Sequence, residues 1–461
     1  VNNTAVDFLS NGETITLSFD IRIIDGILST IQTVTITVSG TNDAPFISNV
    51  TNSSVQEDDL ADGTSPSAAL LTATGTFGID WGADFGDDAD TADVDGVQDT
   101  PTGLGNRSLT FAVLGDQPTQ ATTSDGVAIQ YVLSAGNTVL TAYKGEGRTD
   151  ADKVFEVSLS DDGAGSYRFV LLGNIDHDLP GTGEKAQSWN LDFRVIATDA
   201  GGDTDTATFT VTVNDDAPLA IDAAASTVLD DEAQSLFAGN DTPADGVDNI
   251  RVVSGEAGSL FTMGADALRS IVLTPPAFSV VARDAQGFAQ AESVSWDAGI
   301  SSEGGVTTWT ATSASYPGGA AFLVIRADGS YTFTLNAPVA HLATASGESV
   351  EENLTLGFGF VVTDGDGDTA AGSLAVDVND DAPIAVTAVA ASVLDDEAQG
   401  VFTPANPGGL LDVSPDVKTV SGGAGSLFSM GADGLGAIAL KLPSFAVVFK
   451  DVQGFAQTQS V

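Results

Sequence analysis

The sequence predicts an all-β protein made of tandem β-sandwich modules arranged as a rod. Three observations lead to this prediction: apolar and polar residues alternate along several segments, turn signals separate those segments, and one signature recurs along the chain. The composition agrees, since 51 of the 461 residues are Gly and only 2 are Met. Such a composition favours strands and tight turns over helices.

The predicted strands alternate strictly between apolar and polar positions. A period of two indicates strands of an antiparallel sheet with one buried face. No segment keeps a helical period over three turns, so two sheets packed face to face are the expected way to bury these faces. The apolar positions are Leu17, Phe19, Ile21, Ile23, Leu191, Phe193, Val195, Leu354, Leu356, Phe358, Phe360 and Val362.

Asp-Gly pairs mark turns between predicted strands. They stand at Asp162-Gly163, Asp328-Gly329 and Asp364-Gly365. Such pairs favour hairpins because Gly, and to a lesser degree Asp, tolerates the backbone conformations of a tight turn.

One signature occurs three times. A strand rich in Val, Thr or Ala is followed by Asn-Asp-Ala-Pro or Asn-Asp-Asp-Ala-Pro, ending at Pro45, Pro218 and Pro383. An acidic cluster and then a Gly-Ala-Asp follow each proline, and the Gly-Ala-Asp stands at residues 82–84, 264–266 and 431–433. Segments 258–294 and 425–461 align without a gap and are identical at most positions. The chain is therefore an array of repeats.

These repeats set the predicted boundaries. Residues 1–45 are expected to be the C-terminal part of one repeat, 46–218 and 219–383 complete repeats, and 384–461 the N-terminal part of a further one. We expect the chain to be a segment of a longer protein, cut within a module at both ends. The first complete repeat carries an acidic insert over residues 85–106, which contains Asp87, Asp88, Asp90, Asp93, Asp95 and Asp99.

Composition excludes several function classes. With 64 Asp and Glu against 15 Lys and Arg, the net charge is −49, so nucleic acid and anionic membranes are not expected partners. The absence of Cys removes disulfides and thiolate sites. No apolar run is long enough for a membrane span. Motifs for a serine nucleophile, dinucleotides, phosphates or catalytic zinc are missing, so we expect no enzyme.

Clustered acids predict calcium sites. Ca²⁺ takes six to eight oxygen ligands, and two carboxylates about 5 Å apart repel by roughly 3 kcal/mol at an effective dielectric constant near 20. A recurring cluster of this kind calls for a cation, chiefly at the junctions between modules. The candidate ligands are Asp43, Glu57, Asp58, Asp59, Asp199, Asp203, Asp205, Asp215, Asp216, Asp230, Asp231, Glu232, Asp364, Asp366, Asp368, Asp380, Asp381, Asp395, Asp396 and Glu397.

The alternative interpretation of these acids is a solvated acidic surface of a secreted or salt-adapted protein. For the acidic insert the two interpretations stay equally open. Asp364-x-Asp366-x-Asp368 begins like an EF-hand loop, but Thr369 replaces the required Gly and Ala375 stands in place of the bidentate Glu. This segment is therefore expected to be a turn that can bind calcium, not an EF-hand.

Other residues receive structural interpretations. His177 and His341 occupy the same repeat position, so a structural hydrogen bond is expected of each, and zinc would need nitrogen or sulfur partners that the composition lacks. Trp296 is expected in a core. Trp81, beside Asp80, is expected in a core too, with a sugar-facing position as the alternative.

The chain resembles a known family. The runs from Phe193 and Phe360 to the following Asn-Asp-Asp-Ala-Pro resemble the tandem repeats of giant RTX-type adhesins exported by type I secretion, and residues 1–45 resemble the end of a VCBS-type repeat. The Asn-Asp-Asp-Ala-Pro segment is also similar to the calcium-binding linker of cadherins. The glycine-rich nonapeptide repeats of such proteins and any recognised ligand-binding module are missing here.

The resemblance implies immunoglobulin-like or cadherin-like modules, bound Ca²⁺ and a secreted protein at the bacterial cell surface. The implied function is a calcium-stiffened structural extender of an adhesin or biofilm protein. Its implied partners are neighbouring repeats of the same chain, with surface polysaccharide or other cells contacted through other domains. The alternative is a module that binds a carbohydrate or surface through calcium held by the acidic insert.

Overall fold

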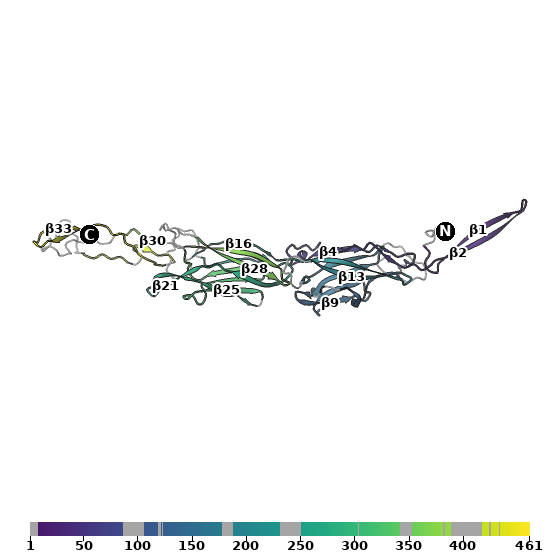
Figure 1. Cartoon of the computed structure of the whole chain (residues 1–461), viewed down its shortest axis with the longest axis horizontal. Coiled ribbons are helices and arrows are strands. Elements are labelled where there is room, and N and C mark those ends of the chain that lie inside the picture. The colour runs from purple at the N-terminus through teal and green to yellow at the C-terminus, as the bar shows by residue number, and fades with distance from the viewer. Residues whose placement is uncertain are drawn as a thin grey trace. The chain divides into compact units, whose positions relative to one another are not determined.

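The computed structural model describes residues 8–85, 106–118, 121, 123–177, 188–230, 250–302, 304–341, 353–380, 383–388, 417–423, 426–432 and 434–461. Contacts divide the chain into two compact units. The first comprises Val1–Ala220, Phe261–Val272 and Val361–Ala371, and the second Ile221–Leu260, Leu273–Phe360 and Gly372–Val461. Within the described residues the fold is tandem β-sandwiches with short 3₁₀ turns, so the predicted all-β class is confirmed (Figure 1).

The first sandwich has two sheets. One runs in the order β5-β12-β11-β10-β9-β8 and the other in the order β4-β14-β13-β7. In Figure 1, β9 marks the first of these layers, and β4 and β13 mark the second. The elements are β4 (Ser53–Gln56), η2 (Glu57–Asp59), β5 (Thr72–Thr76), β7 (Ser108–Phe111), η3 (Leu114–Asp116), β8 (Thr123–Ser124), β9 (Val127–Leu133), β10 (Val139–Lys144), η4 (Asp150–Asp152), β11 (Lys153–Ser160), β12 (Ser166–Leu171), β13 (Ser188–Thr198) and β14 (Thr204–Asn214).

Aromatic rings from both sheets fill the core of this sandwich. Phe193 on β13 and Phe209 on β14 are directly paired, are fully buried, and stack at 5.0 Å between ring centroids. Tyr167 of the opposite sheet stacks on Phe209 at 4.0 Å. Burial of each such ring contributes roughly 1.5–3 kcal/mol. The predicted alternation at Leu191, Phe193 and Val195 is confirmed, because all three are fully buried.

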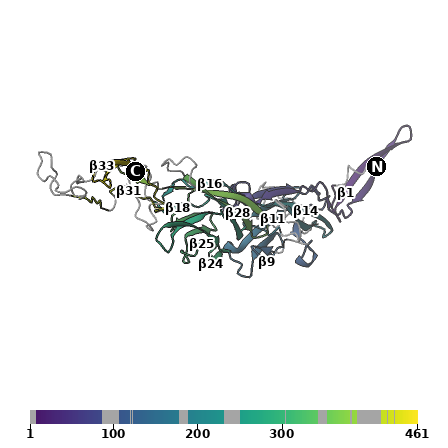
Figure 2. The ribbon, with the colours of Figure 1, turned by 60° about the vertical axis from the view of Figure 1, so that its left-hand side comes forward.

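The second sandwich repeats this strand order. One sheet runs β18-β27-β26-β25-β23, with β24 beside β25, and the other β16-β29-β28-β20, with β17 beside β29. Figure 2 shows β16 and β28 in one layer and β25 in the other. The strands are β16 (Asp222–Ala224), β17 (Leu229–Asp230), β18 (Val252–Gly255), β20 (Leu268–Thr274), β21 (Ser279–Arg283), β22 (Ala289–Ser293), β23 (Ser295–Trp296), β24 (Ile300–Ser302), β25 (Val306–Thr312), β26 (Ala321–Arg326), β27 (Tyr331–Leu335), β28 (Asn353–Asp364) and β29 (Thr369–Asn379).

A short strand pair follows each repeated proline. The two residues after the proline pair antiparallel with the segment that ends two residues before Gly-Ala-Asp. The repeat found in the sequence is therefore also a repeat in structure. The pairs are β3 (Phe46–Ile47) with β6 (Ile79–Asp80), β15 (Leu219–Ala220) with β19 (Phe261–Thr262), and β30 (Ile384–Ala385) with β31 (Phe428–Ser429).

The hairpins near the two ends of the sequence differ from the prediction. β1 (Thr14–Ile24) pairs with β2 (Ser29–Ser39), and β32 (Ala446–Lys450) with β33 (Ala456–Ser460). The sequence predicts that the apolar face of β1 is buried, and this prediction is wrong. The side chains of that face are between 38% and 56% exposed: Leu17, Phe19, Ile21 and Ile23. Among the described residues the sheet of β1 has β2 as its only other strand, and no second layer covers its apolar face.

Candidate metal centre

A group of aspartates, the aspartate cluster, gathers in the first compact unit: Asp215, Asp266, Asp364, Asp366 and Asp368. They come from three places in the sequence. Asp215 follows β14, Asp266 ends the Gly-Ala-Asp after β19, and the others belong to the turn between β28 and β29. Carboxylate oxygens of Asp215, Asp266 and Asp366 all lie within 4.8 Å of one another. The fold thus brings carboxylates from distant segments of the chain close together.

The β28–β29 turn is shaped by its own first aspartate. Oδ1 of Asp364 accepts hydrogen bonds from the backbone N–H groups of Gly367 (2.9 Å) and Asp368 (2.7 Å). Gly367 has a φ of +123°, a conformation that favours glycine. These bonds close the turn and confirm that the segment forms the expected turn.

Several carboxylate oxygens of the aspartate cluster are buried without a hydrogen-bond partner among the described residues: Oδ2 of Asp266, Oδ2 of Asp364 and Oδ1 of Asp366. A buried acceptor left without a partner is unfavourable. Burial, followed by the charge of Asp366, raises the pKa values of Asp215 and Asp266 to about 8. Burial also raises the pKa of Asp364 to about 8. A cation would relieve both costs, and a set of carboxylate oxygens suits Ca²⁺.

Asn174 supports the cluster from the side. Its Nδ2 donates to Oδ1 of Asp266 at 2.6 Å and to Oδ1 of Asp125 at 3.0 Å. This amide fixes one oxygen of Asp266 and leaves Oδ2 as the unpartnered atom. Such outer hydrogen bonds orient metal ligands.

Glu57 of η2 reaches the same region because β4 runs parallel to β14, with Gln56 opposite Asn214. Parallel strands end at the same edge, so the residues that follow them, Glu57 and Asp215, become neighbours. Glu57 is fully buried. Burial and the charge of Asp266 raise its pKa well above the usual range.

A second group, which we call the first-junction group, consists of Asn42, Asp84, Asp199 and Asp203. Oδ2 of Asp84 accepts the backbone N–H of Asp43 at 3.2 Å. Oδ1 of Asp199 accepts the backbone N–H of Asp203 at 2.9 Å, and its Oδ2 is buried without a hydrogen-bond partner among the described residues. Burial raises the pKa of Asp199. Asn42 Nδ2 donates to Oδ2 of Asp203.

Gly201, which has no side chain, lies between the polar side chains of the first-junction group. A Cβ added there would lie 3.1 Å from Oδ1 of Asn42, 3.3 Å from Oδ1 of Asp199 and 3.5 Å from Oδ2 of Asp84. Three oxygens therefore surround a point that the glycine leaves open. The group has the architecture of the aspartate cluster with fewer charges.

Other predicted ligands have different surroundings. Both carboxylate oxygens of Asp216 accept hydrogen bonds: Oδ2 from the backbone N–H groups of Thr64 (2.8 Å) and Ala265 (3.0 Å), and Oδ1 from the Thr64 hydroxyl (2.6 Å). Oδ2 of Asp205 accepts the backbone N–H of Ile47 at 2.8 Å. The Asp205 bond holds β3 to the start of β14, and the Asp216 bonds hold the segment after β14 to the loops that contain Thr64 and Ala265.

Glu57 shares η2 with Asp58 and Asp59. Oδ1 of Asp58 is buried without a hydrogen-bond partner among the described residues. Burial and the charge of Asp59 raise the pKa of Asp58. Asp59 is buried.

The next junction is only partly described. Asp380 Oδ1 lies 3.4 Å from Nδ1 of His341. The sequence groups Asp230 with Asp215 and Asp216, but this grouping is wrong for its backbone, because β17 pairs with β29 and places Asp230 opposite Asn379. The other ligands predicted for these two junctions lie outside the described residues: Asp231, Glu232, Asp381, Asp395, Asp396 and Glu397. So do the six aspartates of the insert, Asp87, Asp88, Asp90, Asp93, Asp95 and Asp99.

The sequence-based ligand set did not include Asp84, Asp266 or Asn174. A signal was present for the two aspartates, because each ends a Gly-Ala-Asp at a fixed repeat position. The location of that triplet depends on the β3–β6 and β15–β19 pairs, which join segments distant in the sequence. Asn174 carries no such signal.

The expected structural roles of the histidines and of two tryptophans agree with the structure. Nε2 of His177 contacts the carbonyl of Val213 at 3.3 Å, and Nε2 of His341 that of Val378 at 3.3 Å. Trp81 is 5% exposed and its Nε1 donates to the carbonyl of Gly163. It is a core residue and not a sugar platform. Trp296 packs edge-on against Phe358 at 5.6 Å.

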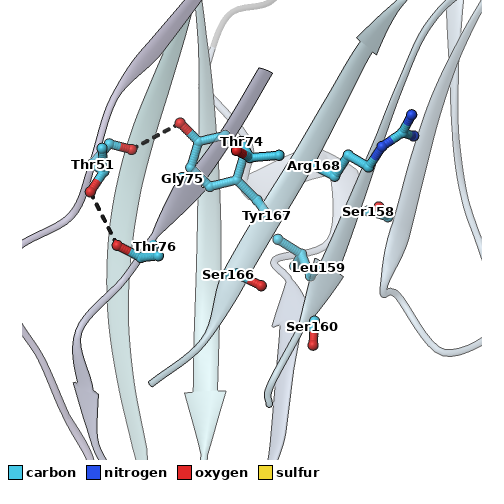
Figure 3. A pocket seen from close by; sticks show the side chains of 10 residues that line it. All are labelled: Thr51, Thr74, Gly75, Thr76, Ser158, Leu159, Ser160, Ser166, Tyr167 and Arg168. Atoms are coloured by element: carbon cyan, nitrogen blue, oxygen red, sulfur yellow. Dashed lines mark hydrogen bonds between the residues drawn. The ribbon is translucent and has the colours of Figure 1, made fainter. Parts of the chain in front are cut away.

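A surface hollow lies over β5, β11 and β12 (Figure 3). Tyr167 donates from its hydroxyl to the carbonyl of Thr51 at 2.8 Å, and Thr51 bonds Thr76 through their hydroxyls. The Tyr167 ring itself is buried, so it offers no exposed aromatic face to a sugar. The lining residues are Thr51, Thr74, Gly75, Thr76, Ser158, Leu159, Ser160, Ser166, Tyr167 and Arg168.

No family model and no curated protein matches the chain. Within the described residues, no helix is long and apolar enough to cross a membrane. Weak structural matches include mouse PcdhgC3 EC1-3 (9% identity, TM-score 0.22, 80% of this chain and 78% of that one), Drosophila N-cadherin EC1-4 (10%, 0.18, 81% and 60%) and zebrafish RET cadherin-like domains 1 to 4 (8%, 0.20, 80% and 58%). At these scores we base no argument on them.

Proposed function

We propose that this chain is a structural, calcium-stiffened segment of a large secreted or cell-surface bacterial adhesin. The observation that carries the proposal is the aspartate cluster with its buried carboxylate oxygens that lack hydrogen-bond partners. Calcium would be held by Asp215, Asp266 and Asp366, with Asp364 and Asp368 in the same turn. Calcium supplies positive charge and several oxygen coordination sites at once.

The cluster explains how an ion would stiffen the chain. Its ligands come from the end of β14, the loop after β19 and the β28–β29 turn, which are far apart in the sequence. Without a cation these carboxylates repel one another, by roughly 3 kcal/mol for a pair about 5 Å apart. A bound ion would turn that repulsion into a cross-link between the end of one repeat and two segments of the next.

The biological setting of the proposal rests on the sequence resemblance to RTX-type adhesins. It includes type I secretion, an extracellular location and a role in adhesion or biofilms. Neighbouring repeats are the proposed direct partners, and polysaccharides or other cells would be contacted by other domains. The alternative of ligand binding through the acidic insert depends on residues outside the described ranges, and we do not propose it.

Thermal unfolding with and without calcium tests the proposal. We expect CaCl₂ to raise the melting temperature well beyond NaCl of equal ionic strength, because an ion that binds only the folded state stabilises it by roughly 2.7 kcal/mol at a hundredfold excess over Kd. Asp366→Asn should reduce the calcium effect. Equal effects of the two salts would mean general screening of a −49 chain and would overturn the proposal.

A further inference from the structure

His177 occupies a buried position beside the aspartate cluster and is 3% exposed. Its Nε2 lies 3.3 Å from the carbonyl oxygen of Val213. A carbonyl oxygen only accepts, so Nε2 carries the proton in this contact. In neutral imidazole the other nitrogen, Nδ1, then presents a lone pair.

That lone pair faces two more acceptors. Nδ1 lies 3.4 Å from Oδ1 of Asp215 and 3.6 Å from Oε2 of Glu57. Among the described residues, Nδ1 of His177 and Oε2 of Glu57 are buried and have no hydrogen-bond partner. Three acceptor atoms that converge in a buried place repel one another unless a proton or a metal cation lies between them.

The distances distinguish a metal from a second proton. A protonated imidazole donates to a carboxylate at about 2.7–2.9 Å, which is shorter than both contacts. Zinc-type ions hold nitrogen and oxygen ligands at about 2.0–2.2 Å, so neighbouring ligands of a tetrahedral site lie about 3.3–3.6 Å apart. The two contacts of His177 have the lengths expected for edges of such a tetrahedron.

We infer that Glu57, His177 and Asp215 form a site for a first-row transition-metal cation of the zinc type. Imidazole nitrogen suits such metals, whereas calcium prefers oxygen alone. The composition predicts no zinc site, because further nitrogen or sulfur ligands are lacking. In the structure two carboxylates lie beside the single imidazole nitrogen, and water would complete a four-coordinate site. Asp215 also belongs to the aspartate cluster. The inference does not depend on calcium binding there.

Each ligand of this site is held by the backbone. The N–H of Ile175 donates to Oε1 of Glu57 at 2.6 Å, and that of Asp216 to Oδ1 of Asp215 at 2.8 Å. Val213 fixes the imidazole ring through Nε2. Such supporting contacts orient ligands before the metal binds.

Part of the arrangement recurs in the next repeat. Nε2 of His341 lies 3.3 Å from the carbonyl of Val378, and its Nδ1 lies 3.4 Å from Oδ1 of Asp380. Nδ1 of His341 also lies 3.0 Å from the carbonyl of Val339, so the next repeat shares the position of the histidine but not the lone pair at Nδ1. Because β17 pairs with β29 as β4 pairs with β14, Asp230 corresponds to Gln56. A carboxylate therefore follows at sequence position 231, as it does at Glu57.

The test uses the full chain with His341→Gln, which leaves His177 as its only histidine. In saturating CaCl₂, Zn²⁺ should shift the Nδ1 resonance of this histidine with near-stoichiometric saturation. Co²⁺ should give the absorption of a tetrahedral site that Zn²⁺ abolishes. Glu57→Gln keeps an oxygen for Ile175 and should weaken Zn²⁺ binding by roughly a hundredfold or more, since even supporting residues change affinity by ten- to a hundredfold.

Glu156→Gln, which removes a partly buried carboxylate that pairs with Lys153 on β11, is the matched control and should leave Zn²⁺ affinity unchanged. Three outcomes would overturn the inference: an Nδ1 resonance that Zn²⁺ does not move, an Nδ1 that stays protonated in saturating Zn²⁺, or Glu57→Gln and His177→Gln variants that stay folded in CaCl₂ and bind Zn²⁺ as the parent does. Because calcium affinity is measured separately, failure here leaves the proposed function standing.

Discussion

Adjacent aspartates in this protein have different surroundings, as Asp215 and Asp216 demonstrate. Asp216 is 3% exposed and its carboxylate is saturated by Thr64 and Ala265. Asp215 instead faces other carboxylates, and burial and Asp366 raise its pKa to about 8. Asp216 thus serves first as a hydrogen-bond acceptor for the loops around it, and Asp215 as a buried member of the aspartate cluster.

Substituting each residue with Asn separates these roles. Asp216→Asn places an amide donor where the structure needs an acceptor, so we expect a loss of roughly 1.5–3 kcal/mol of unfolding free energy, in chelator as well as in calcium. Asp215→Asn removes one repelling charge, so stability in chelator should be unchanged or higher while calcium affinity falls. Unfolding in both conditions, with calcium calorimetry, measures the two effects.

The reverse pattern would contradict this assignment. If Asp216→Asn left stability in chelator unchanged and abolished calcium binding, Asp216 would be a ligand of the ion, as the sequence alone suggests. If Asp215→Asn left calcium affinity unchanged, the centre of the site would lie elsewhere in the β28–β29 turn.

At the scale of elements, the turns of the two long hairpins differ at two positions, of which one changes the charge. The β13–β14 turn reads Asp199-Ala-Gly201-Gly-Asp203, and the β28–β29 turn reads Asp364-Gly-Asp366-Gly-Asp368. Gly201 therefore stands where the aspartate cluster has Asp366. Since ligand charge sets calcium affinity, we expect the aspartate cluster to bind calcium more tightly than the first-junction group.

Exchanging the residues at this position between the two turns should change the calcium affinity of both groups. Gly201→Asp should raise calcium affinity at the first-junction group by roughly tenfold or more, and Asp366→Gly should lower it at the aspartate cluster, because charge count tunes calcium sites over orders of magnitude. Gly201 does not have a positive φ, so the backbone accepts an aspartate, but the side chains of Asn42 and Asp199, 3.1 Å and 3.3 Å from its Cβ, must shift slightly. Calorimetric titration of each variant measures the change.

Gly202→Asp is the matched control, because it adds the same charge one residue later. Gly202 has a φ of +94°, and a Cβ there would meet no atom within 4 Å. The variant should lose stability through backbone strain without gaining affinity. An equal gain in both variants would show that net charge alone attracts the ion.

The sequence predicts local features of these elements well and long-range ones poorly. Alternation placed Phe193 in the core, because a period of two depends only on neighbouring residues. The meeting of Glu57 with Asp215 requires the parallel pairing of β4 with β14, and that of Asp266 with Asp366 requires contacts between distant segments. Exposed Phe19 shows the converse, since alternation cannot supply the second sheet that would bury it.

At the scale of the whole molecule, the two described sandwiches share one strand order and one parallel closing pair, β4 with β14 and β17 with β29. Repetition of this topology repeats the position of the acidic residues as well. We therefore expect the same edge of each sandwich to carry an ion site. A rod of modules remains a prediction of the sequence, and it requires that each junction be rigid.

Small-angle scattering measures that rigidity. In calcium we expect a pair-distance distribution of an elongated, stiff particle. In chelator the maximum dimension or the flexibility should change, because the β28–β29 turn and Asp215 then repel instead of sharing an ion. NaCl of equal ionic strength should not restore the calcium profile, and Asp366→Asn should shift the transition to higher calcium. A compact globule in both conditions, with non-adjacent modules in contact, would contradict the rod.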